Sequence, residues 1–328
     1  MTASRAAVGR IGVVGAGEIA HEHLASLQRL DVPALVYSPS GRAAQLAPRY
    51  GARAVDSLDE LIAASDVVDI CTPTNTHAEI ASAAIARGRH VICEKPFART
   101  HDQAVAIAAQ ARVAGRRVYV AHVVRYFAAY AAARAAVHSG LVGTPTVLRM
   151  SRTGAAPEAD WFHDEARSGG VLMDQMIHDF DFARWVAGDV TSVEARTERG
   201  DGPNIVTATA TLHHASGAVS YATGGWLSPE TPFTTSFSIT GTEGRLTHSN
   251  TGGTVILDRT GSEPIELVAA AVTTADLPFD TQLAEFAAAI AGGAEPRVSA
   301  ADGIAALNLA LAALRSAHFG RVEPVRPD

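Results

Sequence analysis

Lysine is almost absent from this chain, because one residue, Lys95, is the only lysine among the 27 lysines and arginines. An ammonium group is compact and shifts its pKa readily on burial, whereas a guanidinium stays planar and charged. A single lysine among so many arginines is either a survivor of compositional bias or a residue that arginine cannot replace. The second reading assigns Lys95 a specific chemical role.

Cysteine is also scarce, since the chain has only Cys71 and Cys93. Each follows or ends an apolar run, which favours two buried, reduced thiols over a disulfide or a metal pair. No cysteine and histidine residues have the spacing of a zinc site. We therefore expect no bound metal.

Long apolar runs and an excess of positive charge are missing as well. The first ten residues lack the apolar stretch of a secretory signal, and no later stretch of about eighteen apolar residues follows. A formal net charge of -7 argues against a surface that tracks phosphates. These absences predict a soluble, cytoplasmic protein with no nucleic-acid or membrane partner.

The first third of the 328 residues alternates β-branched runs with alanine-rich helical stretches. This alternation is typical of βαβ units and of a doubly wound parallel sheet. It predicts strands at 10–14, 34–37, 67–71, 90–93 and 118–121, with helices that begin near residues 19, 41, 58, 78 and 102.

The pattern changes after about residue 122. A helix is expected at 128–139, a strand at 146–151 and a helix at 170–187, followed by six strand-like segments between 192 and 258 and helices at 280–291 and 300–319. Such segments, separated by turns, predict an open, mainly antiparallel sheet with helices on one face. We expect a Rossmann domain at 1–122 and an α+β catalytic and oligomerisation domain at 123–328, with terminal helices able to pack back on the first domain.

A glycine-rich turn stands after the first predicted strand. Gly15-Ala16-Gly17-Glu18-Ile19-Ala20 has the pattern G-x-G-x-x-A, in which Gly15 permits a tight turn and Gly17 lets backbone approach a pyrophosphate. The small Ala20 allows close packing of helix on strand. The helix N-terminus that follows favours an anion. We predict a dinucleotide site, with Glu18 and Ile19 beside the cofactor.

The end of the second strand bears on the choice of cofactor. An NAD-preferring site usually carries an acid there for the ribose hydroxyls, but this chain has Tyr37, Ser38, Ser40 and Arg42 with no acid. Ser38 and Arg42 are suited to a 2′-phosphate. The sequence favours NADP over NAD, unless Arg42 is only a solvated residue of the next helix.

Two further motifs carry chemistry. Glu94-Lys95-Pro96 ends a predicted parallel strand, at the sheet edge where ligands bind. Asp174, His178 and Asp181 lie four and seven residues apart, which predicts that they share one face of the 170–187 helix. Together these motifs indicate an enzyme rather than a generic dinucleotide binder.

These motifs resemble those of the Gfo/Idh/MocA oxidoreductase family, which includes glucose–fructose oxidoreductase and inositol dehydrogenase. The resemblance runs over nearly the whole chain, through Gly15–Ala20, Glu94-Lys95-Pro96 and the helix with Asp174, His178 and Asp181. It implies hydride transfer between nicotinamide and a secondary alcohol or ketone of a sugar, an inositol or a related cyclitol. It also implies a homodimer or homotetramer formed through the C-terminal sheet.

The resemblance gives the candidate residues their roles. His178 would accept the hydroxyl proton, Lys95 would polarise the same oxygen, and Asp174 would orient the imidazole or a neighbouring hydroxyl. Asp181 is suited equally to contacting substrate and to holding the helix or the domain interface in place. The remaining cofactor candidates are Thr72, Pro73, Asn75, His77 and Glu94, and the remaining substrate candidates are Arg125, Tyr126, Trp161 and His163 with Asp164 beside them. Trp226 and Phe233 are expected to pack or to form an interface.

Two other functions stay open at this point. The first is a lyase or glycosidase that holds NAD(P) tightly and uses it transiently, without net oxidation. The second is a sensor that binds dinucleotide without catalysis, which the intact Lys95, Asp174 and His178 disfavour. A fold alone does not separate these functions.

Overall fold

The computed structural model describes residues 8–202, 204–268 and 277–327. These residues form two units, which are described separately. The first comprises 8–126 and 277–304, and the second comprises 127–268 and 305–327.

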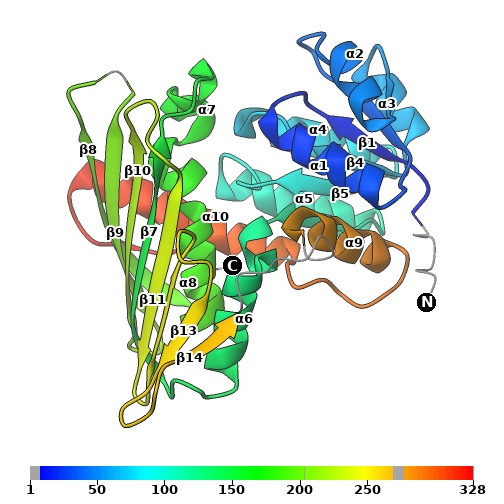
Figure 1. The fold of residues 1–328 in the computed structure, drawn as a ribbon. Coiled ribbons are helices and arrows are strands. Elements are labelled where there is room, and N and C mark those ends of the chain that lie inside the picture. The colour runs from blue at the N-terminus through cyan, green and yellow to red at the C-terminus, as the bar shows by residue number, and fades with distance from the viewer. Residues whose placement is uncertain (1–7, 203, 269–276, 328) are drawn as a thin grey trace. The chain divides into compact units, whose positions relative to one another are not determined.

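The first unit contains a six-stranded parallel sheet flanked by helices (Figure 1). The strand order is β3-β2-β1-β4-β5-β6, the order of dinucleotide-binding folds, in which the order reverses between β1 and β4. The strands are β1 Ile11–Val14, β2 Ala34–Tyr37, β3 Arg53–Ala54, β4 Val67–Ile70, β5 His90–Glu94 and β6 Val118–Ala121. All five predicted strands are confirmed, and only the two-residue β3 was not anticipated.

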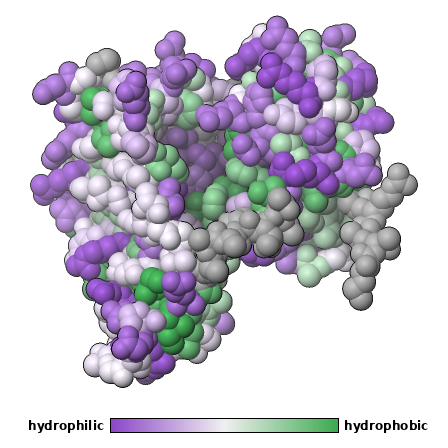
Figure 2. Space-filling model, in the orientation of Figure 1, coloured by the Kyte–Doolittle hydropathy of each residue, from purple (hydrophilic) through white to green (hydrophobic). Residues whose placement is uncertain are grey.

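The helices of this unit begin within two residues of the predicted positions. They are α1 Glu18–Arg29, α2 Ala43–Leu46, α3 Leu58–Ala64, α4 His77–Ala86 and α5 His101–Val113, with 3₁₀ turns η1 Ala47–Tyr50, η2 Thr74–Thr76 and η3 Val123–Tyr126. The caps explain two of the starts, because Ser57 and Thr100 accept hydrogen bonds from the backbone N–H groups of Glu60 and Gln103. Hydrophilic residues gather over α2 and α3 (Figure 2).

A helix from late in the chain completes the first unit. Helix α9, Pro278–Ile290, packs on α1 and on η3. Arg29 of α1 forms an ion pair with Asp280 at 2.6 Å, and Phe286 stacks on Tyr119 with ring centroids 5.1 Å apart. Because Leu283 and Phe286 are almost fully buried, α9 contributes to the core of the dinucleotide-binding fold.

The second unit is built on a nine-stranded sheet of order β14-β13-β12-β11-β7-β10-β9-β8-β15. Strand β7 pairs with β10 in parallel, and the other pairs are antiparallel, so the predicted mainly antiparallel sheet is confirmed. The strands are β7 Pro145–Ala155, β8 Val190–Arg199, β9 Val206–His214, β10 Val219–Leu227, β11 Thr234–Gly241, β12 Arg245–Ser249, β13 Val255–Asp258, β14 Ile265–Val268 and β15 Glu323–Pro324.

Helices cover one face of this sheet (Figure 1). They are α6 Ala128–His138, α7 Glu165–Ser168, α8 Ile177–Ala187 and α10 Ala300–Phe319, with a 3₁₀ turn η4 at Asp160–Phe162. Phe182 of α8 and Phe237 of β11 are buried against each other, with centroids 5.1 Å apart. On the opposite face Tyr221 is exposed, and the unit boundary crosses α10 after Ile304.

The continuous helix predicted over 170–187 is divided in two. Residues Val171–Gln175 form a π-helical turn, in which the N–H of Met176 donates to the carbonyl of Val171 at 2.9 Å, and α8 begins at Ile177. Gly224 of β10 makes room for this turn, because a Cβ there would lie 2.4 Å from the Met176 side chain. The regular α-helical spacing predicted from residue 170 does not hold through Val171–Gln175, since the π turn holds an extra residue. Such turns often accompany functional residues.

No helix in the described part of the chain is long and apolar enough to cross a membrane.

Candidate active site

The first βα turn has the geometry that a pyrophosphate needs. Gly15 has a φ of +126°, and a Cβ at this position would lie 2.3 Å from the carbonyl oxygen of Cys71, so only glycine fits. Gly17 caps α1 in extended conformation, and a Cβ there would meet nothing within 4 Å. The open space beside Gly17, with Glu18 exposed and Ile19 half-buried after it, suits a phosphate on the helix N-terminus.

Three polar side chains are joined beyond β2. The hydroxyls of Ser38 and Ser40 lie 2.9 Å apart, and the Arg42 Nε donates to the Ser40 hydroxyl at 3.1 Å. Arg42 is exposed and Ser38 is buried. The residues therefore form a small cluster of hydroxyls and one guanidinium at the position where Rossmann folds bind the adenine ribose.

The loop after β4 is held by hydrogen bonds of its own side chains. Thr76 donates to the Pro73 carbonyl at 2.8 Å and lies 2.7 Å from the Thr72 hydroxyl. The two ring nitrogens of His77 each lie 2.8 Å from a carbonyl oxygen, one of Thr72 and one of Pro96. His77 thus bridges the loops after β4 and β5, while Asn75 is exposed.

Burial lowers the pKa of His77, and it outweighs the two carbonyl groups, which favour the charged ring. A neutral imidazole donates only one of these two bonds at a time. Because His77 is 1% exposed, its contacts support a role in holding the two loops.

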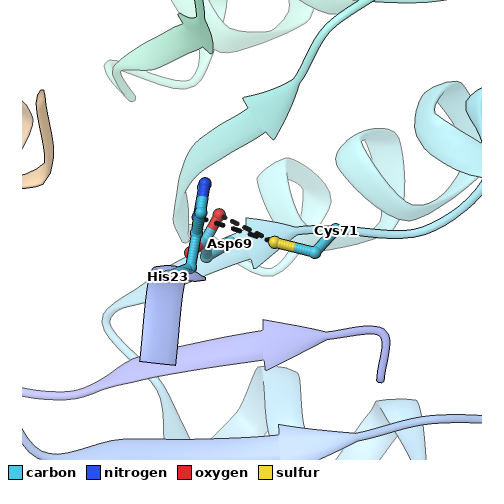
Figure 3. A group of neighbouring side chains, drawn as sticks. All are labelled: His23, Asp69 and Cys71. Carbon is cyan, nitrogen blue, oxygen red and sulfur yellow. Dashed lines mark hydrogen bonds and ion pairs between the residues drawn. The ribbon is translucent and has the colours of Figure 1, made fainter. Parts of the chain in front are cut away.

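A buried group of side chains is connected to the backbone of Lys95 through Glu94. Figure 3 shows His23 of α1 next to Asp69 and Cys71, which come from β4 and the residue after it. The His23 Nδ1 is 2.8 Å from an Asp69 oxygen, and its Nε2 is 3.1 Å from a Glu94 oxygen. The second Glu94 oxygen accepts the backbone N–H of Lys95 at 3.1 Å.

In this group Asp69 favours a charged His23, and His23 in turn favours an ionised Glu94. Burial opposes a charged His23, but the charge of Asp69 and its hydrogen bond prevail and raise the pKa of His23 well above its usual value. Burial also opposes a Glu94 carboxylate, yet His23 and Lys95 lower the pKa of Glu94. Burial, together with Asp69, raises the pKa of the Cys71 thiol to about 12. The directions of these shifts favour a charged His23 ring, an ionised Glu94 and a neutral Cys71 thiol.

The donor atoms of His23, Asp69 and Cys71 also lie close enough to suggest a metal site. A tetrahedral zinc with bonds of about 2.0–2.2 Å to nitrogen and oxygen holds those ligand atoms about 3.4 Å apart. The His23 nitrogen and the Asp69 oxygen are 2.8 Å apart, which is a hydrogen-bond distance. The geometry is that of a charged hydrogen-bond network. This network was not predicted from the sequence, since no local spacing connects His23 with its partners.

The catalytic candidates of the second unit are held by buried groups. Asp174 and Asp181 are buried and His178 is half-buried. Asp179, next to His178, receives two hydrogen bonds from Arg152 of β7, both at 3.1 Å. Although Arg152 opposes it, burial raises the pKa of Asp179.

Gln175 ties the π turn to the same strand, because its amide donates to the carbonyl oxygen of Arg152 at 3.0 Å. The backbone around Asp174 and His178 is thus fixed to the sheet on both sides of Met176.

Arg125 and Tyr126, two substrate candidates, are buried within the first unit. Arg125 is 2% exposed, donates to the Arg297 carbonyl at 2.9 Å and forms an ion pair with Asp302 at 3.0 Å. Tyr126 packs edge-on against Phe286, with centroids 6.2 Å apart. These contacts argue for structural roles, since neither side chain is presented to solvent.

Of the substrate candidates, His163 lines a cleft of about 370 Å³ in the second unit. Gly170 and Trp226 line it too, and the His163 Nε2 is 2.7 Å from the Pro157 carbonyl oxygen. Trp161 stacks on Phe162 at 3.9 Å between centroids. Trp226 is 4% exposed and packs as expected, whereas Phe233 is exposed.

Two family models match the chain, one in its N-terminal part and one in its C-terminal part. Residues 9–122 match the oxidoreductase family with an NAD-binding Rossmann fold, and residues 130–247 match the GFO/IDH/MocA C-terminal domain. The chain belongs to the GFO/IDH/MocA family, as the sequence motifs indicated. It is an NAD(P)-dependent oxidoreductase.

Individual relatives cover almost the entire chain. The 1,5-anhydro-D-fructose reductase of Ensifer adhaerens is 30% identical over 96% of this chain and 98% of its own length. The myo-inositol 2-dehydrogenase of Thermotoga maritima is 29% identical over 94% and 96%. Among solved structures, a levoglucosan dehydrogenase in complex with NADH shares the fold, with a TM-score of 0.88, 22% identity and coverage of 98% and 100%.

Proposed function

We propose that this enzyme transfers a hydride between a nicotinamide cofactor and a secondary alcohol or ketone of a sugar, an inositol or a related cyclitol. The observation that carries this proposal is Glu94-Lys95 at the carboxyl end of β5, with the only lysine of the chain tied by its backbone to a buried carboxylate. The relatives named as a reductase of anhydrofructose and a dehydrogenase of myo-inositol support the substrate class.

Three side chains share the chemistry in this proposal. When bound, the nicotinamide supplies the hydride acceptor or donor. In the oxidation direction His178 accepts the hydroxyl proton, since an imidazole takes up a proton near neutral pH. Lys95 donates a hydrogen bond to the same oxygen and stabilises its developing negative charge. Asp174 orients the His178 ring or a neighbouring substrate hydroxyl. In the reduction direction His178 returns the proton.

We further propose that the cofactor is NADP. The cluster of Ser38, Ser40 and Arg42 supplies hydroxyls and a guanidinium and has no carboxylate to repel a 2′-phosphate. Two relatives of similar fold were solved with NADH or NAD, the levoglucosan dehydrogenase and a protein from gentamicin A biosynthesis. The preference therefore rests on the residues after β2 of this chain.

The first experiment titrates the protein with NADPH and with NADH by nicotinamide fluorescence. A charge-assisted hydrogen bond contributes about 1.5–3 kcal/mol, so Arg42→Ala should weaken NADPH at least about tenfold. The affinity for NADH should stay within about twofold. Arg49→Ala, another exposed arginine nearby in sequence, is the matched control. Equal affinities of the wild type for NADH and NADPH would overturn the NADP assignment.

The second experiment screens polyols, inositols, aldoses and ketosugars with the tighter cofactor. Net oxidation or reduction that is lost in Lys95→Ala and His178→Ala supports the proposal. Turnover of substrate without a net change in nicotinamide absorbance would favour the redox-neutral alternative. Full activity of both variants would overturn the roles of Lys95 and His178.

We also propose that the sheet of the second unit forms a homo-oligomer through the face that its helices leave open. Tyr221 stands on that face, 44% exposed, with the Arg149 guanidinium 5.3 Å from its ring centroid. Light scattering after size-exclusion chromatography should give a dimer or tetramer, and Tyr221→Glu should shift it towards monomer. A monomeric wild type at micromolar concentration would contradict this.

A further inference from the structure

We propose that His23 is a positioning residue for the reaction: as an imidazolium between Asp69 and Glu94, it holds the Glu94 carboxylate that fixes the backbone of Lys95. This inference rests on the proposed function, because it concerns the group that polarises the substrate oxygen. It gives a role to a histidine that stands 71 residues before Glu94 in the sequence.

The hydrogen bonds fit a charged ring. Both nitrogens of His23 face a carboxylate oxygen, Nδ1 that of Asp69 at 2.8 Å and Nε2 that of Glu94 at 3.1 Å. Two ionised carboxylates would only accept hydrogen bonds, and both ring nitrogens would then carry protons, which agrees with the raised pKa of His23 and the lowered pKa of Glu94. His23 and Asp69 are 0% exposed and Glu94 is 5% exposed, which leaves water little access to either carboxylate.

The groups that face His23 in the described part of the chain are mainly acidic. Asp69 and Cys71 face it from β4 and the residue after it, and Glu94 faces it from β5 with Lys95 beyond. On α9 it meets the ring of Phe279, with centroids 5.7 Å apart. Two basic side chains, His23 and Lys95, thus stand beside two acidic ones, Asp69 and Glu94.

Through Glu94, the hydrogen bonds connect His23 of α1 to the backbone of Lys95 after β5. Glu94 uses one oxygen for His23 and the other for the backbone N–H of Lys95. A rotation of the Glu94 carboxylate would therefore release either His23 or the backbone of Lys95. Without the imidazolium, Asp69 and Glu94 would be two buried carboxylates with one fewer positive charge nearby, and Glu94 would move or take up a proton.

The protonation state is tested by ¹⁵N NMR of the imidazole nitrogens in the full-length protein. The His23 signals are identified by their loss in His23→Gln. We expect both nitrogens to remain protonated from about pH 6 to about pH 8, where an ordinary histidine loses its proton. A ring with one unprotonated nitrogen at about pH 7 would overturn the proposal.

The kinetic test compares His23→Gln with His21→Gln, which changes a histidine on the same helix that bonds to Tyr50 outside the network. Misplacing a reacting group by about 1 Å can reduce the rate about 100-fold. We expect kcat of His23→Gln to fall roughly 10- to 100-fold, with KM and cofactor Kd within about twofold of the wild type. The pH profile of kcat in His23→Gln should also differ from that of the wild type. A kcat equal to that of His21→Gln would overturn the proposal.

Two further variants keep the result interpretable if His23→Gln folds poorly. Asp69→Asn should lower the pKa of His23 and reduce kcat in the same direction. The double variant His23→Gln/Glu94→Gln removes both charges, so it should fold better than His23→Gln alone. If Asp69→Asn has wild-type kcat and an unchanged His23 spectrum, the proposal fails.

Failure of the proposed function would look different. Full activity of Lys95→Ala would overturn the role of Lys95 and this inference together. Low activity of Lys95→Ala with wild-type kcat in His23→Gln would overturn this inference alone.

Discussion

The buried ion pair between Arg152 and Asp179 offers the sharpest test of how the second unit is held together. Two hydrogen bonds of 3.1 Å join the side chains, which are 6% and 2% exposed. Replacing Asp179 with asparagine leaves the guanidinium of Arg152 buried without a counter-charge. Loss of one partner from such a pair costs about 3–5 kcal/mol.

This cost converts into a melting temperature. For a unit of roughly 150–250 residues, each kcal/mol lowers Tm by about 2–4 °C, so Asp179→Asn should lower it by about 6–20 °C. Calorimetry with and without bound cofactor measures the shift. The matched control is Asp258→Asn, which breaks an Arg245–Asp258 pair at 3.0 Å whose side chains are about half exposed. That change should cost less than about 1 kcal/mol.

A double variant separates charge from shape. Arg152→Met/Asp179→Asn removes both charges, and most of the lost stability should return, because the desolvation of the unpaired guanidinium is gone. If Asp179→Asn lowers Tm no more than Asp258→Asn does, water reaches the Arg152–Asp179 pair. The reasoning from its burial is then refuted.

Three other predictions concern the first unit. Gly15→Ala should prevent stable folding, because its Cβ would lie 2.3 Å from a carbonyl oxygen, whereas Gly17→Ala should keep the wild-type Tm and lose cofactor affinity in fluorescence titrations. Since burial lowers the pKa of His77 from 6.5, its contribution to stability is present above about pH 6.5 and is lost as pH falls through the lower folded pKa; the Tm difference between wild type and His77→Gln should therefore shrink on acidification, and a constant difference would contradict this. Burial raises the pKa of both the Cys71 and Cys93 thiols, so neither should react with a thiol reagent until the chain unfolds, and rapid reaction of the native protein would show that they are accessible.

Much of the fold was predictable from local pattern. The apolar runs at 34–37 and 118–121 became β2 and β6 with the predicted bounds, because each is short, apolar and enclosed by turn residues. The 300–319 helix also matched α10. The two-residue strands β3 and β15 were not predicted, since two residues are too few to show an alternating pattern.

The helix at 170–187 shows where local reasoning failed. Its apolar spacing fits an α-helix, and the sequence pattern does not reveal the π turn at Val171–Gln175. That turn depends on Gly224, a residue of a distant strand that leaves space for Met176. Tertiary packing therefore determines the backbone geometry around Asp174 and His178.

The sequence by itself determined the glycine turn, the edge of the parallel sheet where Lys95 stands and the family to which these motifs belong, because each depends on residues close together in the chain. Only the tertiary structure placed His23 between Asp69 and Glu94, which are 46 and 71 residues away. It likewise buried Arg125 and Tyr126. The physical reason is the same in each case: burial and charge pairing are set by neighbours in space, and these neighbours come from separate strands and helices.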